Sequence, residues 1–211
     1  MQIREAVVLL NIFYCIASEC IDGVDNILSA DSYGNKNLPV KVRNVKILVY
    51  DIDGQPSCHK NKVNVVLPGY FHIISGEVEV PKNYDLFASN VVRATVKFGS
   101  TDICDNGKSG MLIVPARFCH FDIATVIPEN ICHLLQKKGL HTLKELEEKL
   151  KFNSTFQLPP SPSFLGITLL DLLKGEYRIK VALDVDDEKI MEFAMPSGFK
   201  AIKIGLDDDD E

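Results

Sequence analysis

The sequence predicts a mainly β fold, a two-sheet antiparallel β-sandwich with one or two short helices. Two observations indicate it. Several segments alternate apolar and polar residues with a period of two, as half-buried strands do. Polar turns join these segments, and the regular succession of strands and helices that builds parallel sheets is missing. With 211 residues, of which 46% are hydrophobic, the chain suits one domain with its own core.

The first 20 residues have the pattern of a signal peptide. Arg4 gives a basic start, and residues 6–17 are almost continuously apolar. That stretch is shorter than the roughly 20 residues that span a bilayer, but it suits the apolar core of a signal. Cleavage after Ala17 would keep Cys20, cleavage after Cys20 would remove it, and an uncleaved anchor is the alternative. We therefore expect a secreted or lumenal protein in which residues 21–39 form a flexible lead-in.

The expected domain spans residues 40–206 and begins with β-rich segments. Polar residues at 51–54 are expected to form a turn; calcium binding is the alternative, but the remaining ligand positions are missing. Residues 102–110, rich in Gly and Asp, are expected to form a loop. The predicted strands of this half are Val40–Tyr50, Val63–Leu67, Phe71–Val80 and Val91–Phe98.

A helical region interrupts the strands. Residues 129–138 place Ile131, Leu134 and Leu135 at helical spacing. Thr142 and Glu145 then form a capping-box pattern ahead of a short amphipathic helix. We expect this second helix to lie on the sheet surface or over one end of the sandwich.

The last quarter of the chain joins an apolar segment to a β-hairpin. Residues 164–173 are almost all apolar and follow three prolines. Residues 177–185 then alternate as a half-buried strand, a polar turn follows at 186–189, and two shorter strands end near 204. The apolar segment either packs a core or covers an apolar ligand. The acidic tail, residues 207–211, is expected to be solvated.

An even number of cysteines in a secreted protein predicts disulfides. If Cys20 leaves with the signal, the four that remain are Cys58, Cys104, Cys119 and Cys132. Three pairings are open, and the proximity of neighbours favours Cys58–Cys104 with Cys119–Cys132. In the same context the sequon at Asn153 predicts glycosylation.

Three Cys-His dipeptides, each containing one of these cysteines other than Cys104, could suggest a nucleophile or a zinc site. Adjacent residues on a strand point to opposite faces, however, and oxidised cysteines provide no thiolate. The sequence also lacks a Gly-X-Ser-X-Gly elbow, a phosphate loop and a His-Glu-X-X-His helix. We expect no enzyme, no catalytic residue, no metal and no cofactor. The net charge of −6, without a basic stripe, argues against nucleic acid as a partner.

Several segments resemble the ganglioside GM2 activator-like proteins of the ML (MD-2-related lipid-recognition) family. They are 156–159 with the Pro-fenced apolar segment, 173–179, 118–121 followed by 126–128 and Cys132, and the Asp- and Gly-rich residues 105–110 beside Cys104. The resemblance implies a β-cup, whose two sheets splay apart around an apolar cavity for acyl chains or sterol. The chain has fewer cysteines than the activator and no tryptophan, so lipid binding is implied without ganglioside specificity.

The resemblance also implies site residues. An apolar rim at the mouth of the cavity, in transient contact with a membrane surface, would consist of Phe164, Leu165, Ile167, Leu169, Leu170, Leu172 and Leu173. The cavity wall would consist of Val92, Val96, Phe98, Tyr177, Ile179, Val181 and Leu183.

The expected function is that of a secreted or lysosomal lipid-binding and transfer protein. It would lift a glycolipid, phospholipid or sterol from a membrane, with a lysosomal hydrolase or a receptor as a further partner. The alternative is a secreted interaction module in which the apolar patch at 164–173 docks a receptor or an enzyme.

Overall fold

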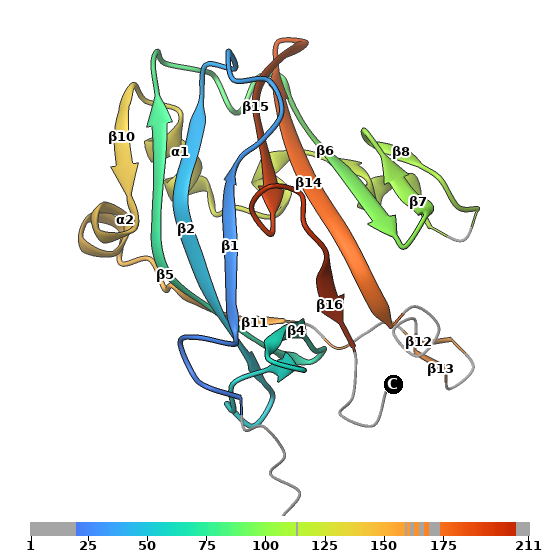
Figure 1. The fold of residues 1–211 in the computed structure, drawn as a ribbon. Helices are drawn as coiled ribbons and strands as arrows, with labels where there is room; N and C mark the ends of the chain where they lie inside the picture. Colours follow the sequence, from blue (N-terminus) through green and yellow to red (C-terminus); the bar gives the residue numbers. More distant parts are fainter. Residues whose placement is uncertain are drawn as a thin grey trace, which may run out of the picture.

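The predicted strands form one large curled sheet (Figure 1). Its order is β10-β5-β2-β1-β15-β14-β16-β4-β3, with β6 beside β14, β7 and β9 beside β6, and β11 beside β5. A separate two-stranded ribbon joins β12 and β13. This computed structural model describes residues 20–112, 114–158, 160 and 174–205, and the backbone of 163–164 and 167–168. The mainly β prediction is confirmed.

The elements have the following bounds. The strands are β1 (Ile27–Ser32), β2 (Lys41–Asp51), β3 (Cys58–His59), β4 (Lys62–Val65), β5 (Gly69–Val80), β6 (Asn90–Phe98), β7 (Thr101–Asp105), β8 (Lys108–Ser109), β9 (His120–Phe121), β10 (Gly139–Thr142), β11 (Thr155–Leu158), β12 (Ser163–Phe164), β13 (Ile167–Thr168), β14 (Gly175–Val185), β15 (Glu188–Met195) and β16 (Ile202–Ile204). The helices are the short 3₁₀ turns η1 (Ala116–Phe118) and η2 (Ile123–Thr125), and the α-helices α1 (Glu129–Leu135) and α2 (Leu143–Leu150).

Strand β14 is the centre of the C-terminal half. It pairs along its length with β6, from Tyr177 opposite Phe98 to Val185 opposite Asn90, and on its other edge with β15 and β16. The turn into β15 places Asp186 and Asp187 at φ of 50° and 62°. Two residues with positive φ give the turn that matches the twist of a hairpin, and short polar side chains tolerate this conformation best. The predicted hairpin is therefore confirmed.

The segment expected to be a flexible lead-in instead contains β1, which joins the two halves of the sheet. Leu28 pairs with Ile47 of β2 and is fully buried, while Ser32 pairs with Phe193 of β15. Before the strand, the buried side-chain amide of Asn26 donates to the carbonyl of Val49 at 3.0 Å. The prediction for residues 21–39 was wrong because only alternate residues of β1 are buried, and polar neighbours hide that pattern. The two predicted sheets are consequently continuous.

The expected loop at 102–110 is largely the β7–β8 hairpin. Asp105 pairs with Lys108, and the two residues between them, Asn106 and Gly107, have φ of 46° and 86°. Asn-Gly is the residue pair that a two-residue hairpin turn favours most, because both positions need positive φ. The sequence contained this signal, and the Gly-rich composition concealed it.

The two α-helices occur where they were predicted. Helix α1 begins at Glu129 but ends at Leu135, and α2 follows β10 directly. The Thr142 hydroxyl accepts a hydrogen bond from the Glu145 amide at 3.2 Å, so the expected N-cap is present. Helix α2 contacts β5 and β10 at the edge of the sheet, and none of its residues is fully buried.

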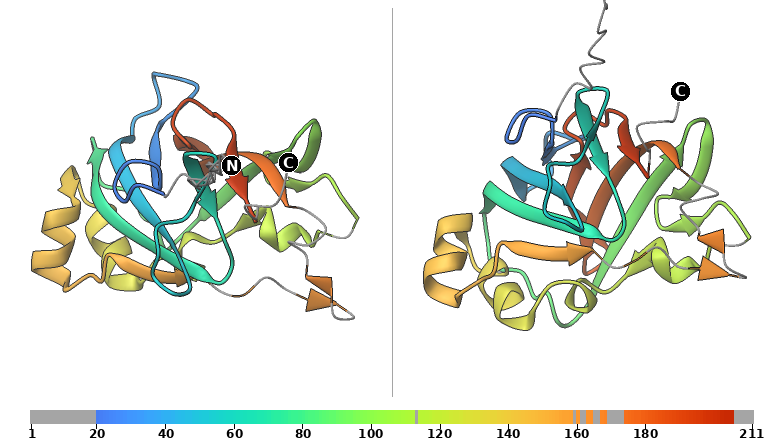
Figure 2. Two further views of the ribbon diagram at one scale, coloured as in Figure 1. Left: turned by 60° about the horizontal axis from the view of Figure 1, so that its bottom comes forward. Right: turned by 90° about the horizontal axis from the view of Figure 1, so that it is seen from below.

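The curl of the sheet turns its two halves toward each other. Figure 2 shows β2 and β5 on one side, β6 and β14 on the other, and the segment from η1 to α1 along the open side. Apolar residues between the halves form two clusters. The basal core contains Leu28, Ile47, Val49, Val65, Ala94, Ile103, Cys104, Cys119, Tyr177 and Ile202. The apical core contains Val40, Val80, Leu86, Val92, Ile123, Cys132, Leu183, Val185 and Ile190.

Candidate functional site

The residues predicted as a cavity wall share the inward face of β6 and β14. Directly paired residues of neighbouring strands lie on the same face of a sheet. Phe98 pairs with Tyr177, Val96 with Ile179, and Val92 with Leu183, while Val181 pairs with Ala94 of the basal core. The period of two in the sequence therefore identified one continuous apolar surface.

Burial along this surface is uneven. Tyr177 at one end of β14 and Leu183 toward the other are 8% and 4% exposed. Between them, Ile179 and Val181 are only half-buried, as is Val96 on β6, although all three pack against the core clusters. The middle of the inward face is therefore less tightly covered than its ends.

The opposite half of the sheet contributes a similar surface. Phe71 and Ile73 of β5 pair with Val49 and Ile47 of β2 and pack against the basal core, yet both remain half-buried. The sequence placed them in a strand, but its residues did not show which strand would face β14. The half-buried apolar side chains of both halves, Phe71, Ile73, Val96, Ile179 and Val181, are called the inner wall below.

The basal end of the wall is aromatic. The rings of Phe98 and Tyr177 lie 5.1 Å apart between centroids. Burial raises the pKa of Tyr177 to about 12, because its charged form would lose hydration. Gly175, at φ +147°, allows this packing, since a Cβ there would lie 2.9 Å from the Phe98 ring. The surroundings of Tyr177 thus favour uncharged, apolar groups.

Most of the predicted rim lies outside the described residues. The backbone of Phe164 and Ile167 is described, and the two residues pair in the β12–β13 ribbon. The other rim residues predicted above, Leu165, Leu169, Leu170, Leu172 and Leu173, are not described.

A second exposed apolar group follows the β7–β8 hairpin, and sequence analysis did not select it. Leu112 is fully exposed and Phe118 is 57% exposed. The Arg117 guanidinium lies 5.4 Å from the centre of the Phe118 ring. Large apolar side chains at this exposure, with a cation among them, suit a surface that is partly apolar and partly charged. The signal in the sequence was the apolar run from Met111 to Val114 within a connecting segment.

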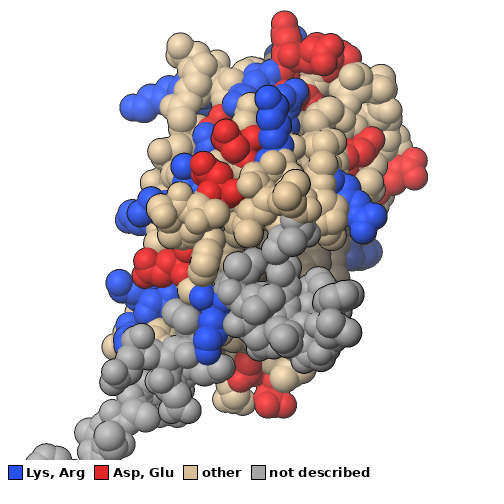
Figure 3. Space-filling model, turned by 90° about the vertical axis from the view of Figure 1, so that its right-hand side faces the viewer, with Lys and Arg blue, Asp and Glu red and all other residues tan. Residues whose placement is uncertain are grey.

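The outward face of the same strands is charged. Arg93 pairs with Asp184 at 2.8 Å, and Lys180 and Lys189 both pair with Glu192, at 3.0 and 2.9 Å. Figure 3 views the side of the molecule that carries β6, β7 and β8, where basic and acidic side chains are interspersed. This face therefore offers no extended basic surface to a nucleic acid.

A surface hollow of about 580 Å³ lies apart from the inner wall. It is lined by Tyr33, Lys36, Lys41 and Glu192, among others. Charged groups around such a hollow would lose hydration on contact with a hydrocarbon chain, which makes it unsuitable for an apolar ligand.

The disulfides differ from the favoured pairing. Cys104 bonds to Cys119, because β7 and the start of β9 lie along the same strand, β6, where Cys104 pairs with Val96 and the Cys119 carbonyl accepts from the Ala94 amide. Cys58 bonds to Cys20. Both the turn that contains Asn26 and the residue before Cys58 are hydrogen-bonded to Val49, which brings these distant segments together.

Cys132 is a free thiol, in contrast to the prediction that it forms a disulfide. It is fully buried in the apical core, where burial raises its pKa above the ordinary thiol value. The paired cysteines are compatible with an extracellular or lumenal protein.

The remaining site predictions concern glycosylation and metals. Asn153 is exposed between α2 and β11, and its side-chain oxygen accepts from the Thr155 amide at 3.0 Å. Within the described residues, no group of three or more His, Cys, Asp or Glu side chains could hold a metal ion. In the same part of the chain, no helix has both the length and the apolar composition needed to cross a membrane.

Comparison with models of known protein families gives no match, and a search of curated proteins also finds no match. The function is therefore inferred from the geometry of this chain.

Proposed function

We propose that this protein is a secreted or lysosomal, non-enzymatic lipid carrier that lifts a lipid from a membrane and shelters its hydrocarbon chains between the two halves of the sheet. The observation that carries the proposal is the inner wall. Its aliphatic side chains face the interior from both halves and still retain accessible surface. A core that served stability alone would bury them, because close packing is the norm in protein interiors.

Hydrocarbon burial supplies the driving force. Each methylene that leaves water contributes about 0.8 kcal/mol, so an acyl chain against an aliphatic wall gains affinity without any specific polar contact. Preformed sites for small molecules are typically concave and lined by apolar and aromatic side chains. The aromatic pair Phe98 and Tyr177 would then lie at the end of the wall where β14 begins.

Membrane contact is assigned to two neighbouring parts of the chain. One is the predicted rim at residues 164–173, and the other is the exposed group of Leu112 and Phe118 with Arg117 beside them. Apolar side chains would enter the interface while the guanidinium stays at the level of the phosphates.

The first experiment asks whether the protein carries lipid. Protein from a eukaryotic secretory host is purified, extracted and analysed by mass spectrometry, and delipidated protein is titrated with a fluorescent fatty acid and a fluorescent phospholipid. We expect a co-purified lipid and saturable uptake of at least one probe. Protein that is empty on purification and takes up neither probe would overturn the proposal.

A pair of variants on β14 locates the site. Ile179→Trp adds volume at the middle of the inner wall, whereas Arg178→Trp places the same side chain on the exposed, opposite face. We expect the first variant to reduce lipid uptake at least tenfold with a small change in stability, and the second to leave uptake unchanged. If the space is filled by protein, Ile179→Trp will instead destabilise the fold by about 1–3 kcal/mol through overpacking.

A second pair tests the membrane contact. Leu112→Asp should weaken sedimentation with phosphatidylserine-containing vesicles several-fold, because it places a charge in the proposed interface. Val126→Asp is the matched control, since Val126 is 62% exposed but follows η2, whose Ile123 belongs to the apical core. Equal effects of the two variants would show that the contact is not localised at the basal end.

A further inference from the structure

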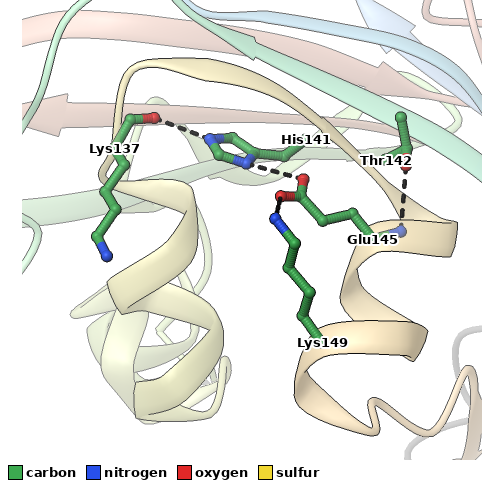
Figure 4. Close-up of polar contacts among 5 residues, drawn as sticks. All are labelled: Lys137, His141, Thr142, Glu145 and Lys149. Carbon is green, nitrogen blue, oxygen red and sulfur yellow. Dashed lines mark hydrogen bonds and ion pairs between the residues drawn. The ribbon is translucent and has the colours of Figure 1, made fainter.

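A buried histidine connects the two α-helices to the edge of the sheet. His141 of β10 is 6% exposed. Its Nε2 lies 2.8 Å from the carbonyl oxygen of Lys137, in the link after α1, and its Nδ1 lies 3.2 Å from Oε2 of Glu145 in the first turn of α2. Figure 4 shows the imidazole ring between these two oxygens.

Both partners of the ring are hydrogen-bond acceptors. A carbonyl oxygen can only accept, and so can a carboxylate. Hydrogen bonding by Lys149, at 2.7 Å, lowers the pKa of Glu145 below its ordinary value, burial opposes the shift, and the hydrogen bond from His141 adds to it. Glu145 is therefore ionised well below neutral pH and cannot act as a donor to the ring.

The charge of the ring follows from its partners. A neutral imidazole has one N–H and one lone pair, so it can satisfy only one of two acceptors, whereas the imidazolium donates from both nitrogens. With the Lys137 carbonyl at the shorter distance, the proton on Nδ1 is the one that distinguishes the two forms.

The surroundings contribute no second charged partner to the ring among the described contacts. On β5, Val78 lies opposite His141, and the neighbouring Glu77 and Glu79 point to the other face of the sheet. From α2, Glu145 contacts the ring and Lys149 contacts Glu145. From α1, His133 pairs with Glu129 and stacks on Phe87 instead.

We propose that His141 is a pH-sensitive clasp: its protonated ring fastens the start of α2 to the link after α1, and loss of the Nδ1 proton releases Glu145. Histidine is the side chain that changes charge between roughly pH 5 and 8, the range that separates acidic compartments from the cell exterior. Helix α2 is sensitive to this one bond because none of its own residues is fully buried. The clasp does not depend on the proposed lipid binding.

Hydrogen exchange tests the mechanical consequence. Protection factors of the α2 amides, corrected for intrinsic exchange rates, should fall about tenfold from pH 5.5 to pH 8, the effect of one charge-assisted hydrogen bond. His141→Gln should abolish this pH dependence, while the control His133→Gln, at a more exposed histidine with its own carboxylate partner, should retain it. Protection of α2 that is constant with pH in the native protein, or that still varies in His141→Gln, would overturn the proposal.

Nitrogen NMR of the unmutated protein tests the charge state directly and needs no folded variant. With histidine labelled at both ring nitrogens, His141 should show two protonated nitrogens at pH 5.5 and a single protonated Nε2 at pH 8. A ring that keeps one N–H throughout this range would contradict the clasp.

Discussion

The basal and apical cores solve the same packing problem differently. The apical core is closed by Cys132 of α1 and Ile123 of η2 and contains a free thiol. The basal core includes the Cys104–Cys119 disulfide and is bordered by most of the half-buried inner wall. The end with the less complete apolar packing is thus the one with a covalent constraint. Stability at the apical end comes from burial, whereas the basal end combines burial with a cross-link and leaves apolar surface available.

The largest expected difference is between a sealed and an open position. Leu28→Ala should lower the free energy of unfolding by about 2–5 kcal/mol, because the fully buried side chain leaves a cavity. Ile179→Ala should cost about 1 kcal/mol, since a half-buried side chain loses less apolar area and leaves no closed void. Urea denaturation of the two variants and the parent measures both values. Equal losses would mean that the inner wall is packed as tightly as the core.

Removal of the basal cross-link comes next. Cys104→Ser with Cys119→Ser should lower the free energy of unfolding by about 3 kcal/mol, the value for a loop of this length, where the two residues are 15 apart in sequence. Differential scanning calorimetry of variant and parent gives the change. Cys132→Ala is the matched control in the apical core and should cost about 1 kcal/mol for its lost side-chain volume. A larger loss in the control would reverse the comparison.

Thiol chemistry sharpens the same contrast. Within residues 20–205, iodoacetamide should modify no cysteine in the native protein and Cys132 alone after unfolding without reductant. The physical reason is that Cys132 is fully buried and that burial raises the pKa of its thiol, so neither access nor thiolate is available. Peptide mass spectrometry identifies the modified residue. Labelling of Cys104 or Cys119 in the unfolded protein would contradict the assigned pairing.

The smallest effect is expected from the charged outer face. Burial alone would raise the pKa of Glu192, but hydrogen bonds from Lys189 and Lys180 outweigh it and lower the pKa. A folded-state pKa below the unfolded value gives stability that is present above the unfolded pKa, near 4.5, and is lost as pH falls through the folded pKa. Between pH 6 and pH 3, Glu192→Gln should therefore lose less stability than the parent, measured by urea denaturation at each pH. A parallel loss in both proteins would assign acid sensitivity elsewhere.

The local elements of the fold could largely be predicted from the sequence. The alternation at Tyr177–Val185, the Asp186-Asp187 turn and the Thr142 cap each depend on residues close in the chain, and all three occur as expected. Strand β1 was missed because its burial arises from pairing with β2 and β15, which its own residues do not encode. Of the candidate site, the sequence found the wall on β6 and β14 and missed Phe71, whose position across from it depends on the curl of the sheet.

The sequence by itself determined which residues form strands and which face of β14 is apolar, because a period of two fixes the side on which each side chain lies. The tertiary structure alone decided the cysteine partners and the imidazole contacts of His141. Cys20 and Cys58 are 38 residues apart, and their bond forms only because both segments attach to β2. Contacts between distant segments depend on the whole sheet, since each strand is placed by its neighbours rather than by its own residues.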